Sequence, residues 1–186
     1  MNNLNIKYHN VDVEKIKNLI NVNNKIIHKI QNTVLNLPAL NIVNNKELLS
    51  KTIIKTNKFA KNKYYFIVFG IGGSNLGSKA LINILQGKEK KRILFYDNID
   101  PINFKNSLEK FDLMKIGYII VSKSGSTLET LSQFACLIEL FEQKKQLEIF
   151  YKNCLIITEN KPSPLRKIGI QNNCEILDHE TEIGGR

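Results

Sequence analysis

A glycine-rich turn, Gly70-Ile71-Gly72-Gly73-Ser74-Asn75-Leu76-Gly77, is the first segment of this sequence that could bind a charged ligand. It lies between an apolar run and a helical pattern, where backbone N–H groups and the positive end of a helix dipole favour an anion. Its glycines, Gly73 among them, let the backbone approach a ligand closely, and Ser74 adds a hydroxyl donor. The turn predicts a phosphate site, with a tight turn that needs glycine only for packing as the alternative.

Two familiar nucleotide motifs come near this turn and do not fit it. The dinucleotide fingerprint requires glycine or alanine three residues after its second glycine, and Asn75 stands there. A P-loop requires lysine directly after its final glycine, whereas Lys79 follows Gly77 only after one more residue. One residue of helix rotates a side chain by about 100°, so Lys79 would point away from the phosphates. Neither motif is predicted.

A second turn, Ser122-Lys123-Ser124-Gly125-Ser126-Thr127, combines four hydroxyls, one ammonium and a glycine in six residues. Hydroxyl and backbone donors with one cation can satisfy the oxygens of a phosphate monoester without a metal. A serine-rich helix cap would explain one or two of these residues but not all of them. The second turn therefore also favours phosphate binding.

The elements around both turns predict an α/β fold. Short apolar runs that read as strands alternate with helical windows, which is typical of a parallel sheet. The run Phe66-Ile67-Val68-Phe69 suits a strand covered on both faces, so we expect an open, doubly wound sheet of five strands. Ligands of such sheets bind at the carboxyl ends of the strands, where the two turns could share one site. The strands are expected at 65–69, 92–96, 118–121, 154–158 and 175–177, and the helices near 75–86, 101–113, 127–145 and 163–169.

The first 63 residues have a different texture from the rest. Apolar residues recur at helical spacing within 11–36, Pro38 marks the end of that pattern, and a second helical stretch includes Leu48 to Ala60. We expect residues 1–63 to form a helical segment packed on the core, and residues 64–186 to form the α/β domain.

Composition limits the classes of function. The net charge is +10, yet 24 of the 27 cations are lysines spread along the chain, beside 24 asparagines and 27 isoleucines. A/T-rich codons explain this bias more simply than contacts with nucleic acid, which would cluster Lys and Arg on one face.

The sequence has neither a signal-peptide pattern nor an apolar run long enough to span a membrane. We interpret Cys136, Cys154 and Cys174 as reduced core residues of a cytoplasmic protein, with neither a disulfide framework nor a metal site.

The two turns and the final Glu182-Ile183-Gly184-Gly185-Arg186 together resemble the glucose-6-phosphate isomerase (phosphoglucose isomerase) family. The first sugar-isomerase (SIS) domain of that family carries a Gly-Ile-Gly-Gly-Ser-x-Leu-Gly turn, a Ser-Lys-Ser/Thr-x-x-Thr-x-Glu-Thr turn and a Gly-Gly-Arg segment, in this order. The resemblance runs from about Tyr65 to Arg186. It implies a flavodoxin-like three-layer fold and the interconversion of glucose 6-phosphate and fructose 6-phosphate in glycolysis and gluconeogenesis, without metal or organic cofactor.

The resemblance also implies roles for single residues. Gly73 and Ser74 would lie near the sugar, and Ser122, Lys123, Ser124 and Thr127 would hold the 6-phosphate. Arg186 would stabilise the enediolate that forms when the proton leaves C2, because it is a permanent cation beside the reacting carbons. The family's catalytic base and ring-opening histidine follow Gly-Gly-Arg, so they cannot be assigned in this chain, which we interpret as a truncated product, a split-gene product or a fragment of an enzyme that is a homodimer.

Two alternatives remain. In the first, a stand-alone SIS module binds a phosphosugar without catalysis and regulates a partner. In the second, the chain is a basic nucleic-acid-binding protein. His179, Glu180 and Glu182 lie close to Arg186 in sequence, but a polar loop explains them better than a substitute catalytic pair.

Overall fold

The computed structural model describes residues 12–22, 30, 33, 36–85, 92–100, 108 and 112–184, which fall into two compact units. The first unit, Met1–Asn45, contains helix α1 (Val13–Val22), helix α3 (Pro38–Asn41) and a 3-10 turn at Ile42–Asn44. Pro38 is the first residue of α3, where its missing N–H and fixed φ suit a helix start. The second unit, Lys46–Arg186, contains the five strands. It also contains helix α4 (Lys46–Ala60), which lies within the predicted helical segment 1–63. That residues 1–63 form one segment packed on the core stays a prediction.

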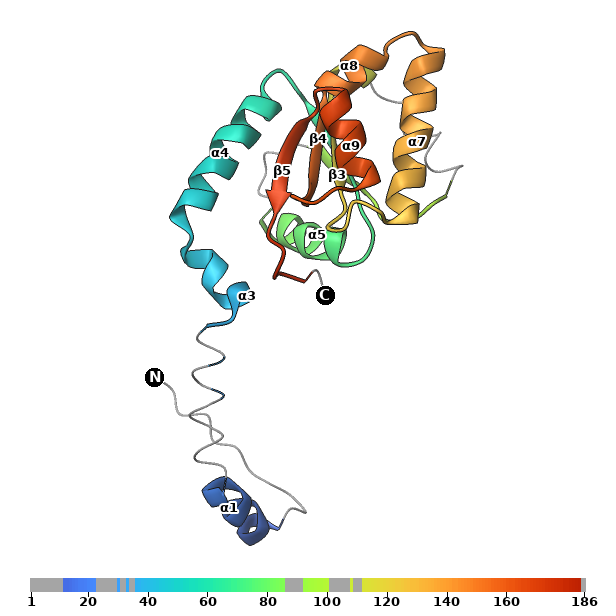
Figure 1. Ribbon diagram of the computed structural model, residues 1–186. Coiled ribbons are helices and arrows are strands. Elements are labelled where there is room, and N and C mark those ends of the chain that lie inside the picture. Colours follow the sequence, from blue (N-terminus) through green and yellow to red (C-terminus); the bar gives the residue numbers. More distant parts are fainter. Residues whose placement is uncertain are drawn as a thin grey trace. The chain divides into compact units, whose positions relative to one another are not determined.

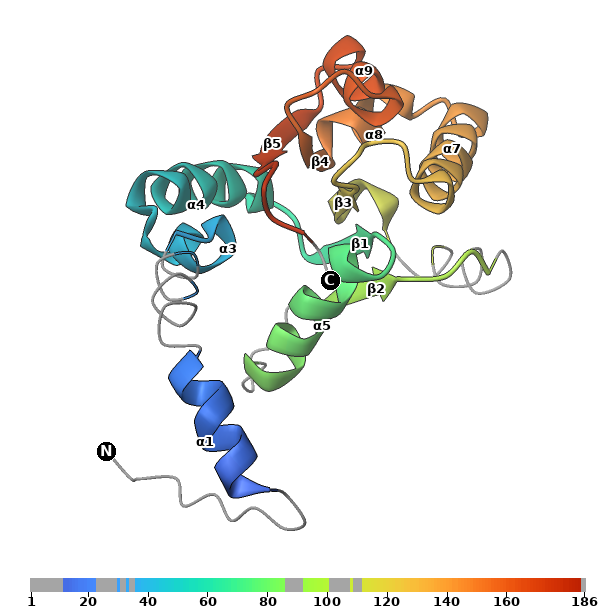
Figure 2. The same ribbon diagram turned by 60° about the horizontal axis from the view of Figure 1, so that its bottom comes forward.

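The five strands form one parallel sheet in the order β2-β1-β3-β4-β5. Figure 2 shows this order across the sheet. Four of the five residues of β1 are buried, which agrees with a central strand covered on both faces. The strands are β1 (Tyr65–Phe69), β2 (Arg92–Tyr96), β3 (Ile116–Val121), β4 (Cys154–Glu159) and β5 (Glu175–His179).

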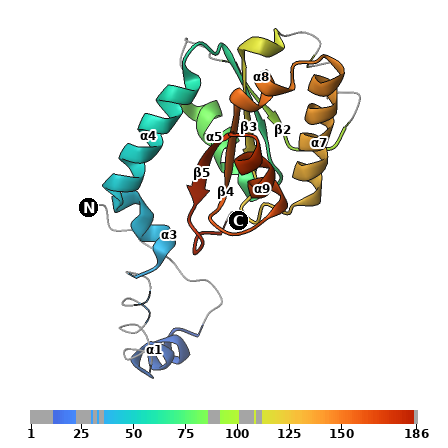
Figure 3. The ribbon, with the colours of Figure 1, turned by 45° about the horizontal axis from the view of Figure 1, so that its top comes forward.

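Helices cover both faces of the sheet, as the two separate groups of buried side chains show. On one face, Phe59 of α4 packs with Phe66 and Leu155, and α4 lies alongside β5 (Figures 1 and 3). On the other face, α7, α8 and α9 cover the sheet. The helices of this unit within the described residues are α4 (Lys46–Ala60), α5 (Gly73–Leu85), α7 (Leu128–Gln143), α8 (Leu147–Lys152) and α9 (Pro164–Gln171), with a 3-10 turn, η2, at Leu113–Lys115.

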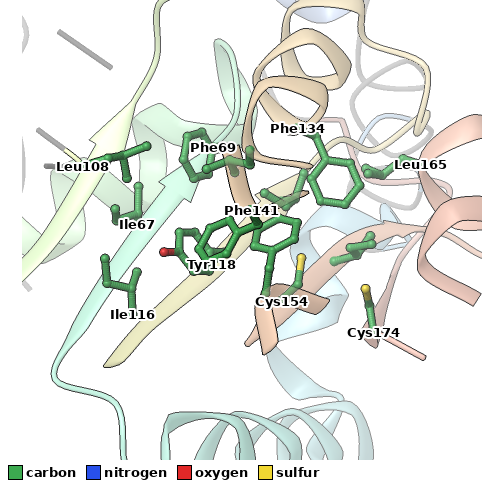
Figure 4. Packing of buried hydrophobic residues seen from close by; sticks show 14 residues of the cluster. Ile67, Phe69, Leu108, Ile116, Tyr118, Phe134, Phe141, Cys154, Leu165 and Cys174 are labelled. Atoms are coloured by element: carbon green, nitrogen blue, oxygen red, sulfur yellow. The ribbon is translucent and has the colours of Figure 1, made fainter. Parts of the chain in front are cut away.

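The larger core group is rich in aromatic rings (Figure 4). Tyr118 of β3 contacts Phe141 and Phe150 edge-on, with ring centroids 5.5 and 5.2 Å apart. Its hydroxyl donates to the backbone oxygen of Leu113 at 3.1 Å. This bond gives the one polar atom of the ring a partner inside an apolar core.

The doubly wound α/β fold predicted from the sequence is confirmed, with the 2-1-3-4-5 order of flavodoxin-like sheets. β3 and β5 each extend two residues beyond the predicted runs, and the short helix α8 was not predicted. The expected helix at 101–113 lies almost entirely outside the described residues. No helix within the described ranges is both long enough and apolar enough to cross a bilayer.

One prediction about the core is wrong. Cys154 and Cys174 are buried, but Cys136 is exposed on α7. The buried stripe of α7 includes Phe134, and Cys136 follows it by about 200° around the helix axis, on the solvent side. An apolar segment was mistaken for a fully buried one.

Candidate functional site

The two predicted turns lie side by side because they follow neighbouring strands. The first turn leaves β1 and the second leaves β3, and β1 and β3 are hydrogen-bonded in parallel. Their carboxyl ends therefore meet at one edge of the sheet, where a cavity of about 650 Å³ lies between the turns. The cavity is lined by Ile71, Gly72, Gly73, Ser74, Ser78, Val121, Lys123, Ser124, Thr127, Glu159 and His179.

Glycine is required in the first turn for both packing and backbone conformation. A β-carbon at Gly70 would stand 3.2 Å from the backbone oxygen of Val121, at the end of β3. Gly72 has φ +57°, a backbone conformation that residues with a β-carbon rarely adopt. Helix α5 then begins at Gly73, with Ser74 in its first turn and at the cavity. The packing explanation of this turn is thus supported, and the turn also lines the cavity, while its role as a phosphate site stays a prediction.

The second turn is ordered by its own hydroxyls. The Ser122 and Thr127 hydroxyl oxygens are 2.9 Å apart, and the Gly125 N–H donates to Ser122 Oγ at 3.1 Å. The Ser126 hydroxyl donates to Ser124 Oγ at 3.1 Å. Ser122 is 1% exposed and lies behind the cavity rather than in its lining. Its hydroxyl thus ties the two ends of the turn together.

Lys123 brings a positive charge to the cavity. Its ammonium donates to the backbone oxygen of Thr181 at 2.7 Å and lies 3.6 Å from Glu159 Oε1. The Lys123 side chain is 34% exposed, so the ammonium is reachable from solvent. A cation, hydroxyl oxygens and a helix N-terminus at one cavity form an arrangement that can bind a phosphate group.

Two lining residues, Glu159 and His179, were not predicted as site residues. They are the last residues of β4 and β5 and are register partners in the sheet. A hydrogen bond from Lys161 and the charges of Lys161 and Lys123 hold the pKa of Glu159 below its usual value. His179 Nδ1 lies 2.8 Å from the backbone oxygen of Glu180. Both residues stand at the carboxyl end of a strand, and the two turns lie at the same edge of the sheet. This position is the sequence signal that could have identified them as site residues.

Five of the seven predicted site residues line this one cavity: Gly73, Ser74, Lys123, Ser124 and Thr127. Ser122 supports the turn from behind, and Arg186 lies outside the described residues. Within the described ranges, His, Cys, Asp and Glu side chains form no cluster of three or more that could hold a metal ion. That the reaction uses neither metal nor organic cofactor stays a prediction.

Comparison with known proteins relates this sequence to one family. The sequence profile of phosphoglucose isomerase matches residues 19–186. A probable glucose-6-phosphate isomerase of Methanococcus maripaludis is 32% identical, over 98% of this chain and 44% of the relative. A glucose-6-phosphate isomerase of Borreliella burgdorferi is 33% identical, over 99% of this chain and 38% of the relative. The chain thus spans less than half the length of these curated relatives.

Solved structures agree on the fold. A glucose-6-phosphate isomerase from Chlamydia trachomatis superposes with a TM-score of 0.62 at 30% identity, over 75% of this chain and 26% of that protein. A hypothetical protein from Thermus thermophilus superposes with a TM-score of 0.72 at 22% identity, over 91% and 42% of the two chains. Because the profile match extends over most of the sequence and includes both turns, this chain belongs to the phosphoglucose isomerase family.

Proposed function

We propose that this chain forms the phosphosugar-binding part of a glucose-6-phosphate isomerase. One observation carries the proposal: the Gly-Gly-Ser turn and the Ser-Lys-Ser turn line a single cavity at the carboxyl edge of the sheet. Family membership supports a hexose 6-phosphate as the ligand. The cavity volume, about 650 Å³, lies within the usual range of small-molecule sites.

The phosphate would be held at the second turn. Lys123 supplies the cation, and Ser124 and Thr127 supply hydroxyls from the cavity wall. Ser122 acts indirectly, because its hydroxyl bonds Thr127 Oγ1 and the Gly125 N–H. Charge-assisted hydrogen bonds of this kind are the strong ones, so Lys123 is expected to contribute most to affinity. The sugar would extend toward Gly73 and Ser74.

The reaction proposed for the whole enzyme moves a proton between C2 and C1. A base removes the C2 proton, an enediolate forms, and the proton returns to C1 as the aldose becomes a ketose. Arg186 is the proposed cation for the enediolate oxygen. The base and the ring-opening acid are not assigned to residues of this chain. A cytoplasmic location and a homodimeric enzyme belong to the same proposal.

Calorimetric titration with 6-phosphogluconate tests the ligand. The chain should bind it, and Lys123→Ala and Ser122→Ala should weaken binding while the circular dichroism spectrum stays unchanged. Lys144→Ala and Ser132→Ala are matched controls, since both side chains are exposed on or beside α7 and away from the cavity. Unchanged affinity in both site variants would refute the phosphate assignment.

A turnover assay separates the isomerase from the alternatives. Conversion of fructose 6-phosphate into glucose 6-phosphate would establish isomerase activity in this chain. Tight binding without turnover would favour a non-catalytic phosphosugar-binding module. Affinity for DNA or RNA that falls steeply with salt, with indifference to hexose phosphates, would favour the nucleic-acid reading instead.

A further inference from the structure

Lys123 is held by the end of strand β4 through both its main chain and its side chain. The Glu159 N–H donates to the Lys123 backbone oxygen at 3.0 Å. The Thr158 hydroxyl donates to the same oxygen at 3.3 Å. At the other end of the residue, the ammonium lies 3.6 Å from Glu159 Oε1. Glu159 therefore contacts both ends of the lysine on which phosphate binding is proposed to depend.

The Glu159 carboxylate lies between two ammonium groups. Its Oε1 faces Lys123, and its Oε2 lies 3.0 Å from Lys161 Nζ. The Glu159 side chain is only 12% exposed, whereas those of Lys123 and Lys161 are 34% and 62% exposed. Glu159 is thus the least exposed of the three side chains.

A carboxylate in a phosphate site needs a reason. If Glu159 acted on the ligand directly, it would repel a phosphate dianion and weaken binding. A lysine side chain, by contrast, is a flexible four-carbon stem with a single charge, so it gains from a partner that restricts its position. Since Glu159 lines the same cavity as Ser74 and Thr127, it can restrict the Lys123 ammonium at the place where a phosphate would enter.

We propose that Glu159 is a positioning residue, which holds the Lys123 ammonium at the cavity for the phosphate of the sugar. The proposal rests on the function proposed above and adds to it a residue that acts through Lys123. Glu159 itself touches no reacting atom in this assignment. Its main-chain bond to Lys123 does not depend on the side chain, so Gln and Asp substitutions at this position test the carboxylate alone.

For Glu159→Gln, a repulsive role and a positioning role of the carboxylate predict opposite changes in the affinity for 6-phosphogluconate. The substitution removes a negative charge beside the anion site, so a purely repulsive carboxylate would leave the variant binding 6-phosphogluconate more tightly. A positioning carboxylate predicts weaker binding, by about three- to tenfold, because one long side chain must now be ordered on binding. Equal or tighter binding in Glu159→Gln would overturn the proposal.

Matched variants isolate the pair. Glu148→Gln makes the same chemical change on the exposed surface of α8 and should leave affinity unchanged. Glu159→Asp keeps the charge on a shorter stem and should bind between the wild type and Glu159→Gln. In a Lys123→Met background, Glu159→Gln should no longer weaken binding, because the residue through which it acts is gone. An equal loss in both backgrounds would count against positioning.

A measurement without ligand keeps this proposal separate from the proposed function. The full chain is labelled with a trace of acetic anhydride, and acetylation of Lys123 is quantified by mass spectrometry. Lys123 should be labelled about threefold or more faster in Glu159→Gln than in wild type or Glu148→Gln, since its ammonium loses a partner. Unchanged labelling would refute the positioning role. A wild-type chain that binds no 6-phosphogluconate would refute the proposed function, while the labelling would still decide the role of Glu159.

Discussion

Gly125 in the second turn lies so close to Ser163, the N-cap of α9, that a β-carbon on residue 125 would overlap the Ser163 side chain. The same β-carbon would stand 2.9 Å from Thr158 Oγ1, and Gly125 has φ +65°. The Gly125 backbone oxygen also accepts a hydrogen bond from the Leu165 N–H at 3.1 Å. The turn is therefore built against the end of β4 and the start of α9, and its glycine is fixed by that contact.

We expect Gly125→Ala to lower the free energy of unfolding by at least about 2 kcal/mol, because strained φ and a steric overlap add together. Gly72→Ala should cost about 1–2 kcal/mol, since φ is +57° there but a β-carbon at this position would have no atom within 4 Å. Gly77→Ala, in the body of α5 with open space around it, should be neutral or slightly stabilising. Urea denaturation of the three variants measures the order, and equal costs at 125 and 77 would contradict this account.

Tyr118→Phe should lower the free energy of unfolding by about 0.5–1.5 kcal/mol. The substitution keeps the ring contacts with Phe141 and Phe150 and removes the bond from the Tyr118 hydroxyl to the Leu113 oxygen. Burial also raises the pKa of Tyr118, so its phenol should ionise only as the protein unfolds in alkali. Tyr64→Phe serves as the control, since that side chain is exposed, and its effect should stay within about 0.5 kcal/mol.

The three thiols should react with Ellman's reagent in two phases. Cys136 is exposed and should react first, whereas Cys154 and Cys174 are buried and should react only when the protein opens. Burial raises the pKa of the Cys154 thiol, which lowers its reactivity further. Cys136→Ser should abolish the fast phase and leave the slow phase intact. More than one fast thiol in the wild type would contradict the structure.

The ion pair between Lys79 of α5 and Asp97, the residue after β2, should make a small pH-dependent contribution to stability. The two charged atoms are 2.7 Å apart, and a hydrogen bond from Lys79 holds the pKa of Asp97 below its ordinary value of 3.8. A carboxyl group with a lower pKa in the folded state stabilises the protein above its unfolded pKa and loses that contribution as pH falls through its folded pKa.

Asp97→Asn should therefore cost at most about 0.5 kcal/mol at pH 7, because both side chains are well exposed and screened. The difference between variant and wild type should shrink as pH falls below 3.8 and through the folded-state pKa of Asp97, and urea unfolding curves at pH 7 and at acid pH measure it. Glu148→Gln, on the surface of α8, is a control for general charge effects. A larger difference at low pH than at pH 7 would contradict the assigned pair.

The parts of the fold that follow from short-range patterns could be predicted from the sequence. The runs Tyr65–Phe69 and Arg92–Tyr96 are strands with the expected bounds, because strands of a parallel sheet covered by helices are largely apolar. The helix α8 was missed because its six residues, Leu147–Lys152, are too few to show a helical period. Cys136 was misplaced because an amphipathic helix buries only one stripe of an apolar segment.

In the candidate site, too, the residues of local turns could be predicted from the sequence, and those brought in by strand pairing could not. Ser74, Lys123 and Thr127 belong to local turns, and their clustering follows from the parallel order of β1 and β3. Glu159 and His179 come from strands β4 and β5, and only the pairing of those strands brings them to the same cavity. The indirect position of Ser122 likewise depends on its bonds to Thr127 and Gly125. The phosphate roles of these residues stay predictions.

The second turn is joined to strand β4 and helix α9 by backbone hydrogen bonds, which affect how a ligand would enter the cavity. Backbone bonds join Ser122 N–H to Ile157, Glu159 N–H to Lys123 and Leu165 N–H to Gly125, at 3.0–3.1 Å. These amides should exchange their hydrogens with solvent as one cooperative unit, since the turn cannot open without loosening β4 and α9. A phosphate arriving at the cavity would therefore meet a loop that is already shaped, and little conformational entropy would be lost in closing around it.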